Sequence, residues 1–315
     1  MGLKGTSKLK VIFFGLGSIG QRHLKNLRTL CEQKYIDLEV HAYRTNKQNN
    51  AHVNGVATNF YSMDEIIGNY DAAFITNPTS YHYETLNYIK KRARYFFVEK
   101  PLFDRKHNIE AMKIQSHKVY VAAPLRFKNI MKRLREFIAD KDIYSVRVIC
   151  SSYLPHWRNV DYRNSYSAMK DLGGGVELDC IHELDYVTYL FGFPSRVNVL
   201  LGKKSNLSID SNDIAVYTME YADKIVEVHL DYFGIYPQRK IELITNEDLI
   251  VCDLLQDTIT SEKYGLIEQV CEEKNVMYLN ELNYFLNEVV AEKDNFNDLI
   301  HAYKVLMLAK GEILQ

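Results

Sequence analysis

The chain has 315 residues and a formal net charge of −1, because 39 Lys and Arg stand against 40 Asp and Glu. At ~100–200 residues per domain, this length favours two domains. Apolar residues make up 47% of the chain and charged residues 25%, which excludes intrinsic disorder as a description of the whole. The near-neutral charge also excludes nucleic-acid binding through a broadly basic surface, but it leaves room for a local cationic pocket.

Signals for export, membranes and metals are missing as well. No apolar run approaches the ~20 residues that a membrane-spanning helix needs, and the early apolar stretch at 11–14 is too short for a signal peptide. The five cysteines are widely spaced and contain no Cys-x-x-Cys, which suggests neither a disulfide framework nor a metal site. We therefore expect a cytoplasmic protein with reduced thiols, no metal, and neither a membrane nor a nucleic-acid partner.

The first third of the chain alternates β-rich runs with helical patterns. A helix is expected directly after the first strand and its glycine turn. The strands of this part, including the first, are expected at 11–14, 38–43, 71–75, 95–98 and 119–123. Further helices are expected at 62–69, 80–92 and 104–118. Strand and helix in repetition indicate parallel crossovers and a doubly wound sheet. We place this α/β nucleotide-binding domain at residues 1–122.

Beyond residue 122 the rhythm changes. Strands are expected at 144–153, 196–201, 213–221, 224–232 and 239–244, with a tight hairpin at 222–223, and helices at 129–140, 176–191, 275–292 and 295–313. Consecutive strands with short connections indicate an antiparallel sheet. The expected fold class is therefore α/β followed by α+β: a Rossmann-type parallel sheet, then a mostly antiparallel, substrate-binding domain at 123–315.

A complete Gly-x-Gly-x-x-Gly stands between the first strand and its helix. Gly15 would allow the tight turn, Gly17 would let a pyrophosphate approach the backbone, and Gly20 would let helix and strand pack closely. Ser18 and Ile19 open the helix, whose N-terminus would face the phosphates. The motif in this context predicts dinucleotide binding.

The position that selects between cofactors follows the second strand. An acidic residue about 20 positions after the glycines would bind the ribose 2′-hydroxyl of NAD(H). This chain has Arg44 instead, 24 residues after Gly20. A guanidinium attracts a 2′-phosphate through charge-assisted hydrogen bonds, so Arg44 favours NADP(H) over NAD(H). The alternative is an Arg44 that stacks on adenine without selecting by charge.

Three further motifs bring a family into view. Ile75-Thr-Asn-Pro-Thr-Ser-Tyr-His82 follows the strand at 71–75, and Glu99-Lys-Pro101 follows the strand at 95–98. A Gly-Gly-Gly run at 173–175 leads into Val-Glu-Leu-Asp-Cys-Ile-His. Together with the glycine motif, their order and spacing resemble the Gfo/Idh/MocA oxidoreductases, which include glucose–fructose oxidoreductase and inositol dehydrogenase. The resemblance covers nearly the whole chain.

The resemblance implies a catalytic lysine. Lys100 would lie beside the nicotinamide and hydrogen-bond the reacting hydroxyl or carbonyl, because an ammonium can polarise that oxygen and a desolvated amine can relay a proton. A strand-end Lys100 that merely pairs with Glu99 is the alternative. Other residues that we expect near the cofactor are Thr76, Asn77, Pro78, His82 and Glu99. For His82 the alternative is a residue at a helix start without a chemical role.

The resemblance also implies a proton-transfer group between Asp179 and His182. A helix at 176–191 would place Asp179, His182 and Tyr186 on one face, which on pattern alone could equally be a solvated surface. His182 is the first choice as general base, because imidazole titrates near neutral pH. Family members commonly separate this Asp and His by four positions and this chain by three, so the base stays open between Asp179 and His182.

The loop at 154–166 holds the only tryptophan together with arginines and tyrosines. Aromatic faces and bidentate donors suit a sugar with an anionic substituent. The loop resembles that of family members in bacterial surface-sugar synthesis; a tryptophan that packs the loop beside surface arginines is the alternative. We expect substrate contacts from Arg126, Trp157, Arg158, Arg163, Tyr166, Asp179 and His182.

These residues predict an oxidoreductase that depends on NADP(H), with NAD(H) as the alternative cofactor. A hydride would pass between the nicotinamide and a hydroxyl or carbonyl carbon of a sugar derivative, such as an amino sugar, sugar phosphate or nucleotide sugar. A glycosidase that uses NAD transiently and a nucleotide-binding regulator without turnover are the alternatives. The resemblance further implies a homodimer or homotetramer.

Overall fold

The computed structural model describes residues 8–45 and 53–314, and the chain divides into two compact units. The first unit consists of Met1–Ala122 and Tyr278–Ala302, and the second of Ala123–Met277 and Tyr303–Gln315. Within the described ranges, no helix is both long and apolar enough to cross a membrane.

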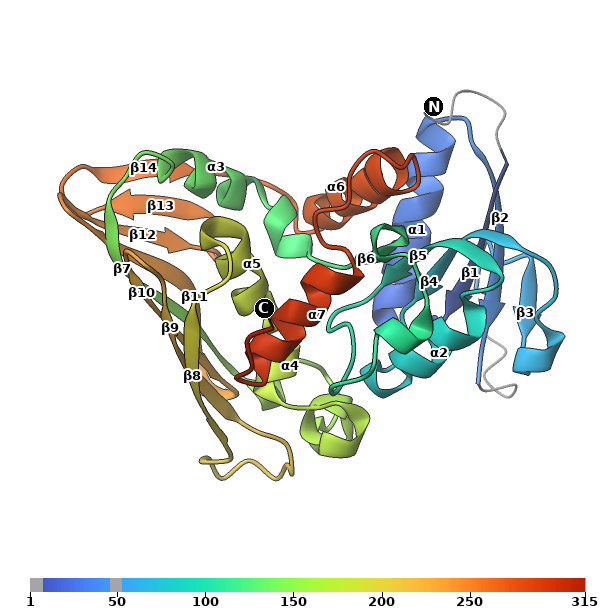
Figure 1. Cartoon of the computed structure of the whole chain (residues 1–315), viewed down its shortest axis with the longest axis horizontal. Coiled ribbons are helices and arrows are strands. Elements are labelled where there is room, and N and C mark those ends of the chain that lie inside the picture. Colours follow the sequence, from blue (N-terminus) through green and yellow to red (C-terminus); the bar gives the residue numbers. More distant parts are fainter. Residues whose placement is uncertain (1–7, 46–52, 315) are drawn as a thin grey trace. The chain divides into compact units, whose positions relative to one another are not determined.

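The first unit contains a six-stranded parallel sheet (Figure 1). Its strands are β1 (Lys8–Phe14), β2 (Asp37–Tyr43), β3 (Thr58–Phe60), β4 (Tyr70–Ile75), β5 (Ala93–Val98) and β6 (Val119–Val121). Their order is β3-β2-β1-β4-β5-β6, so the direction of winding reverses between β1 and β4. This is the doubly wound order of a dinucleotide-binding sheet, and it confirms the predicted first architecture.

Helices α1 (Ser18–Gln33) and α2 (His82–Ile89) belong to the same unit. The helices expected at 62–69 and 104–118 are wrong, because the structure has only short 3₁₀ turns there. In the first case the turn at Met63–Glu65 ends before Gly68, which has a φ of +86°. In the second, Lys113 adopts a left-handed φ of +52° directly after the turn.

A late segment of the chain returns to this first unit. It carries α6 (Val276–Tyr284), which continues into a π-helical turn at Phe285–Val289. The Phe285 ring packs against Phe74 and Phe97 of the sheet, with centroids 5.8 and 5.4 Å apart. The expected second domain at 123–315 included this segment, because helical periodicity predicts a helix without showing which sheet it covers.

The second unit contains an eight-stranded sheet in the order β14-β13-β12-β11-β7-β10-β9-β8. Its strands are β7 (Ile143–Tyr153), β8 (Arg196–Gly202), β9 (Ile214–Glu220), β10 (Ile225–Asp231), β11 (Phe233–Thr245), β12 (Leu249–Asp253), β13 (Thr258–Ser261) and β14 (Gly265–Gln269). Only β10 and β7 pair in parallel, so the predicted mostly antiparallel sheet is confirmed. The hairpin at 222–223 is also confirmed, since the Tyr221 N–H donates to the Lys224 carbonyl at 3.0 Å.

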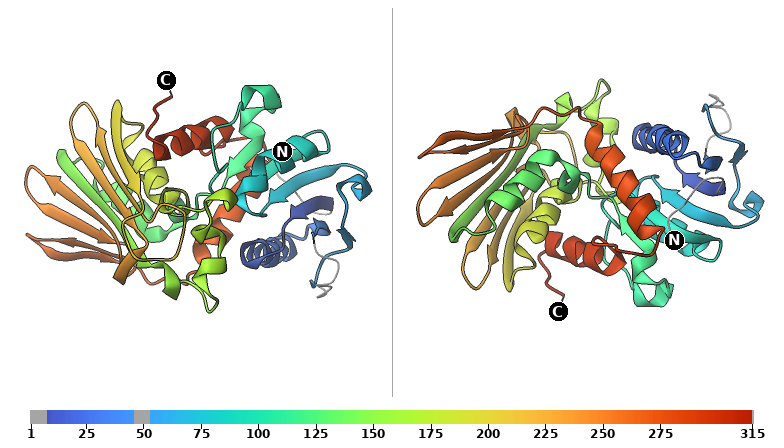
Figure 2. Two further views of the ribbon diagram at one scale, coloured as in Figure 1. Left: turned by 90° about the horizontal axis from the view of Figure 1, so that it is seen from below. Right: turned by 90° about the horizontal axis from the view of Figure 1, so that it is seen from above.

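Helices α3 (Asn129–Phe137), α4 (Val176–Asp179) and α5 (Ile181–Phe191) cover one face of this sheet (Figures 1 and 2). The opposite face carries no helix among the described residues of the unit. The last helix, α7 (Leu299–Ala309), passes from the first unit into the second. The continuous helix expected at 176–191 is wrong, because Cys180 leaves the helical region at a ψ of 28° and separates α4 from α5.

Candidate functional site

The glycine turn after β1 has the shape that a pyrophosphate site requires. Gly15 has a φ of +94°, and a Cβ there would lie 2.8 Å from the backbone of Asn77. A Cβ at Gly20 would lie 2.4 Å from the Gly15 carbonyl oxygen, so neither position tolerates a side chain. At Gly17, in contrast, a Cβ would meet nothing within 4 Å. The middle glycine therefore faces open space where a phosphate would approach.

The N-terminus of α1 supplies the donors. The helix starts at Ser18, with Ile19 half-buried behind it, and neither a side-chain cap nor an acidic residue occupies its first turn. Backbone N–H groups at such a helix start attract anions. The Thr76 hydroxyl donates to the Gly15 carbonyl at 2.5 Å and so fastens the turn to the end of β4. These residues fit a dinucleotide.

Arg44 lies directly after β2, at the carboxyl edge of the sheet. Its backbone N–H donates to the Phe60 carbonyl at 2.9 Å, and its side chain is half-buried. Because all six strands are parallel, their carboxyl ends share one edge, and Arg44 lies on the same edge as the glycine turn. In doubly wound dinucleotide-binding sheets, the residue that contacts the adenosine ribose follows the second strand, as Arg44 does here.

His82 joins two loops at this edge. Its ring is 1% exposed, with Nδ1 3.1 and 3.2 Å from the carbonyl oxygens of Pro101 and Leu102, and Nε2 2.9 Å from that of Asn77. Burial lowers the pKa of His82. His82 therefore connects the Asn77 backbone to the loop after β5, and its expected place near the cofactor stays a prediction.

Glu99 is bound by a histidine that the motif analysis missed. His23 Nε2 lies 2.5 Å from Glu99 Oε1, and both side chains are buried. Burial alone would raise the pKa of Glu99, but the hydrogen bond and charge of His23, with the charge of Lys100, hold it below its usual range. The other oxygen, Oε2, accepts the Lys100 N–H at 3.1 Å. The signal in the sequence was a histidine three residues after Gly20, hence on the same face of α1.

Lys100 follows β5 and is half-buried, and its peptide bond to Pro101 is cis. Since β5 neighbours β4 and β4 neighbours β1, the structure gathers three loops at one edge: the glycine turn, the loop at 76–78 and Lys100. The predicted cofactor residues of the first unit thus lie on loops at this edge, and His82 and Glu99 hydrogen-bond to the backbone of these loops.

A second cluster lies in the second unit around Asp179. This carboxylate is 5% exposed, and the Tyr232 hydroxyl donates to its Oδ2 at 2.5 Å. Burial raises the pKa of the Tyr166 phenol, and the charge of Asp179 and a hydrogen bond to it raise it further. Two phenols therefore bind Asp179. Sequence reasoning named Tyr166 but missed Tyr232, whose only signal was an aromatic residue at the end of a strand.

Trp157 and Arg158 join this cluster. The Trp157 and Tyr232 rings pack edge to face at a centroid distance of 5.3 Å, and the Trp157 indole N–H donates to the Ser152 hydroxyl at 3.0 Å. The Arg158 guanidinium lies 5.3 Å from the centre of the Tyr166 ring. An aromatic surface and a cation thus lie beside a buried carboxylate, as a site for a polar ring with an anionic substituent requires.

Other residues expected here have different partners. Arg126 is 4% exposed and bidentate to Asp185, with Nε–Oδ2 and Nη2–Oδ1 distances of 2.8 and 2.6 Å, so the structure shows it in a buried ion pair. Arg163 pairs with Asp161 at 2.6 Å on the exposed loop surface. His182 is half-buried in the first turn of α5, beyond the break at Cys180, so it does not share one continuous helix face with Asp179.

Comparison with protein families gives two consecutive matches. Residues 9–122 match the model described as an oxidoreductase family with an NAD-binding Rossmann fold. Residues 131–249 match the C-terminal domain of the same Gfo/Idh/MocA family. The two models follow the order of the parallel and the antiparallel sheet.

Two curated proteins are similar in sequence. An uncharacterized oxidoreductase, YrbE, of Bacillus subtilis (strain 168) is 24% identical over 236 residues, which cover 71% of this chain and 67% of that protein. The 2,7-anhydro-N-acetylneuraminate hydratase of Escherichia coli (strain K12) is 25% identical over 218 residues, which cover 66% of this chain and 58% of that protein.

Solved structures share the fold over nearly the full length. A levoglucosan dehydrogenase in complex with NADH superposes with a TM-score of 0.80 at 17% identity, covering 97% of this chain and 96% of that one. The WlbA dehydrogenase from Bordetella pertussis, in complex with NADH and UDP-GlcNAcA, gives a TM-score of 0.76 at 16% identity, covering 96% and 95%. With both family models matched in order and both sheets in place, the chain belongs to the Gfo/Idh/MocA family of oxidoreductases with an NAD-binding Rossmann fold.

Proposed function

We propose that this protein transfers a hydride between a nicotinamide cofactor, preferably NADP(H), and a hydroxyl or carbonyl carbon of a sugar derivative with an anionic substituent. The observation that carries the proposal is the shared sheet edge, where Lys100 lies with the open glycine turn and the loop at 76–78. The names of similar proteins, a levoglucosan dehydrogenase and a WlbA dehydrogenase bound to UDP-GlcNAcA, support a sugar as the substrate class.

The first unit would hold the cofactor. Gly15, Gly17 and the N-terminus of α1 bind the pyrophosphate, and Arg44 binds the ribose 2′-phosphate through charge-assisted hydrogen bonds. Thr76, Asn77 and Pro78 shape the wall at the nicotinamide end. When bound, the nicotinamide supplies the hydride acceptor or donor.

We assign proton transfer to Lys100, Asp179 and His182. Lys100 donates a hydrogen bond to the reacting oxygen and so stabilises the negative charge that develops there. Asp179 already accepts hydrogen bonds from the phenols of Tyr232 and Tyr166, so we assign it to binding and orienting a substrate hydroxyl. His182 then takes or returns the hydroxyl proton as general base.

Substrate recognition is assigned to the cluster around Asp179. The exposed part of Trp157 offers an aromatic face to a sugar ring, and Arg158 offers a guanidinium to a carboxylate or phosphate. The same chemistry would bind a uronic acid, a sugar phosphate or a nucleotide sugar, because each combines a polar ring with an anion.

The deciding experiment is a substrate panel with the purified protein. Neutral sugars, uronic acids, sugar phosphates and nucleotide sugars are each combined with NADP⁺, NADPH, NAD⁺ and NADH, and nicotinamide absorbance is followed. Stoichiometric reduction or oxidation with an anionic sugar is the expected result. Product formation without net cofactor change would favour a hydratase or glycosidase reaction, and one similar curated protein is named a hydratase. Cofactor binding without any product would indicate a regulator.

We further infer that the uncovered face of the second sheet forms a homodimer or homotetramer. Leu200, 75% exposed, pairs directly with Val216 on this face, and the apolar side chain of Ile149 lies on the same side. A surface cavity of about 420 Å³, lined by Ile149, Val216 and His229 among others, makes this face concave. Light scattering of the full chain tests this: a monomer at micromolar concentration would contradict it, and Leu200→Glu is expected to shift an oligomer toward monomer.

A further inference from the structure

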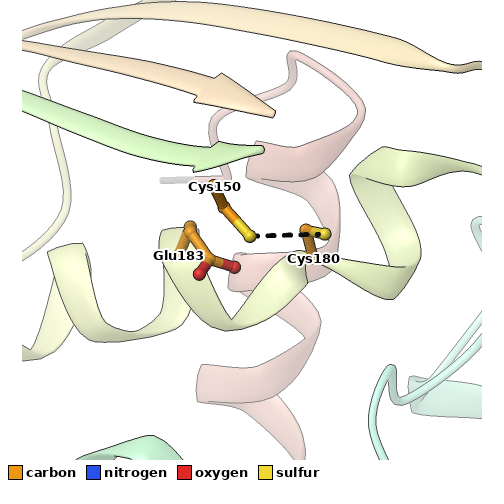
Figure 3. Close-up of side chains that lie close together, drawn as sticks. All are labelled: Cys150, Cys180 and Glu183. Atoms are coloured by element: carbon orange, nitrogen blue, oxygen red, sulfur yellow. Dashed lines mark hydrogen bonds between the residues drawn. The ribbon is translucent and has the colours of Figure 1, made fainter. Parts of the chain in front are cut away.

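Three side chains that lie apart in the sequence meet inside the second unit (Figure 3). Cys150 comes from β7, Cys180 from the break between α4 and α5, and Glu183 from the first turn of α5. The two sulfurs are 3.8 Å apart, and one ligand atom from each residue lies within 4.8 Å of the others. All three residues are at most 4% exposed.

Glu183 is unusual for a buried carboxylate. Arg239 Nε lies 2.8 Å from Glu183 Oε1 as a close ion pair, but it lacks hydrogen-bond geometry, and neither oxygen of Glu183 accepts a hydrogen bond from any residue that the structure describes. The Tyr186 hydroxyl, buried and within the electrostatic reach of Glu183, has no hydrogen-bond partner among these residues either. Buried carboxylates are normally hydrogen-bonded or bound to a metal, so this arrangement calls for a further occupant.

The spacing of the sulfurs matches a metal centre. Two thiolates bound to one tetrahedral zinc at about 2.3 Å each lie about 3.8 Å apart. The observed separation is the same, so two sulfur ligands are already positioned. A hydrogen bond between two neutral thiols has a similar length. The nearby Glu183 carboxylate and the charge balance of the cluster therefore have to distinguish a metal site from a neutral thiol pair.

The charges of the cluster balance with a divalent cation. Two thiolates and one carboxylate carry three negative charges, which a divalent metal and the Arg239 guanidinium neutralise. Arg239 Nη2 also donates to Cys150 Sγ at 3.4 Å, the kind of second-layer hydrogen bond that supports a metal-bound thiolate. Soft sulfur ligands select zinc over magnesium or calcium.

We propose that Cys150, Cys180 and Glu183 form a site for Zn²⁺, with the fourth position left to a water molecule. Binding releases the two thiol protons to solvent and forms two Zn–S bonds and one Zn–O bond, with no change of oxidation state. Because Cys180 follows Asp179 and Glu183 follows His182, the metal would fix the junction of α4 and α5 that carries both residues. The inference is independent of the proposed reaction, since it concerns residues outside it.

The test uses the reduced full-length protein, stripped of metal with a chelator. Titration with Co²⁺ is expected to give thiolate-to-cobalt charge-transfer and tetrahedral d–d absorption at one equivalent, which Zn²⁺ then removes. Zinc is also expected to raise the melting temperature, by linkage to the folded state. Cys150→Ser and Cys180→Ser should abolish the charge-transfer bands, while Arg239→Gln should weaken zinc binding by roughly 10–100-fold.

Cys252→Ser, at a buried cysteine on β12 outside the proposed ligand set, is the matched control and should bind cobalt as the wild type does. If a ligand variant fails to fold, the wild-type cobalt spectrum still decides. Wild-type protein without charge-transfer bands, and without a zinc-dependent melting shift, would overturn the proposal in favour of a neutral thiol pair. An air-formed disulfide in place of metal binding, seen as a mass loss of two hydrogens, would overturn it too.

Discussion

His23 and Glu99 form a buried pair, with Nε2 and Oε1 2.5 Å apart, that joins the first turns of α1 to the end of β5. One end of this connection carries the glycine turn, and the other carries Lys100, whose backbone N–H binds the second Glu99 oxygen. The pair therefore links the two loops of the first unit that we assign to the phosphates and to the reacting oxygen.

Removing His23 should cost stability. His23→Ala leaves Glu99 buried without its partner, and loss of one member of a buried pair costs about 3–5 kcal/mol. Urea unfolding should show this loss, and KM for the cofactor should rise because the loop after β5 loses its support. His117→Ala, at an exposed histidine of the same unit, is the control and should leave both quantities near wild type. Equal stability of the two variants would contradict a supporting role.

The same pair makes stability depend on pH. The pKa of Glu99 is lowered in the folded protein from its ordinary value of about 4.5, so the folded state is stabilised when the pH is above that value. The contribution disappears as the pH falls through the folded pKa. The difference in unfolding free energy between wild type and Glu99→Gln should therefore be largest near pH 7 and shrink below about pH 4.5. Glu110→Gln, at an exposed position, should show no such trend.

Lys100→Ala should separate binding from chemistry. Loss of the ammonium that stabilises the reacting oxygen should lower kcat by a factor on the order of 10²–10⁴, while the cofactor Kd changes little. Stopped-flow turnover and fluorescence titration with NADPH measure the two quantities. Lys91→Ala, at an exposed lysine, is the matched control. A variant with wild-type kcat would refute the catalytic assignment of Lys100.

Arg44→Ala tests cofactor selection. If the guanidinium binds a 2′-phosphate, loss of a charge-assisted hydrogen bond should weaken NADPH binding by roughly 10–100-fold and leave NADH binding nearly unchanged. Arg94→Ala, at an exposed arginine of the same unit, should affect neither cofactor. Equal losses for NADPH and NADH would show that Arg44 contacts adenine without reading the phosphate.

Substitution of Arg126 and of Arg158 should affect different properties, namely the stability of the fold and the binding of substrate. Arg126→Ala breaks the buried bidentate pair with Asp185 and should cost about 3–5 kcal/mol in urea unfolding. Arg158→Ala should leave stability near wild type and raise KM for an anionic sugar, with KM for a neutral analogue as the internal control. Arg163 binds Asp161 on the surface, so Arg163→Ala should change both quantities only slightly.

The sheets could be predicted because their signals are local. Val11 to Phe14 forms an apolar run covered on both faces, and the glycines that follow have steric reasons that show in their spacing. The short strands β3 and β12 to β14 were missed because three to five residues give little periodicity. No glycine or proline marks Cys180, so the break in the helix was invisible in the sequence.

Partners distant in the chain were beyond prediction for a different reason. Sequence reasoning assigned Arg126 to the substrate because a guanidinium suits an anion. It did not show that Asp185, 59 residues later in the chain, forms an ion pair with Arg126 in the fold. The same holds for Cys150 and Cys180, whose 30-residue separation gives no metal-binding spacing. Only the fold shows which side chains meet.

The return of Tyr278–Ala302 to the first unit affects how the protein is made. The polypeptide passes between the units three times, so on the ribosome the nucleotide-binding sheet stays without Phe285 until nearly the whole chain has emerged. Until then, the side of Phe74 and Phe97 that Phe285 covers stays exposed, because Phe285 lies more than 180 residues later in the chain. The order of synthesis and the order of assembly therefore differ, and a fragment ending at residue 122 would lack the layer that completes its own core.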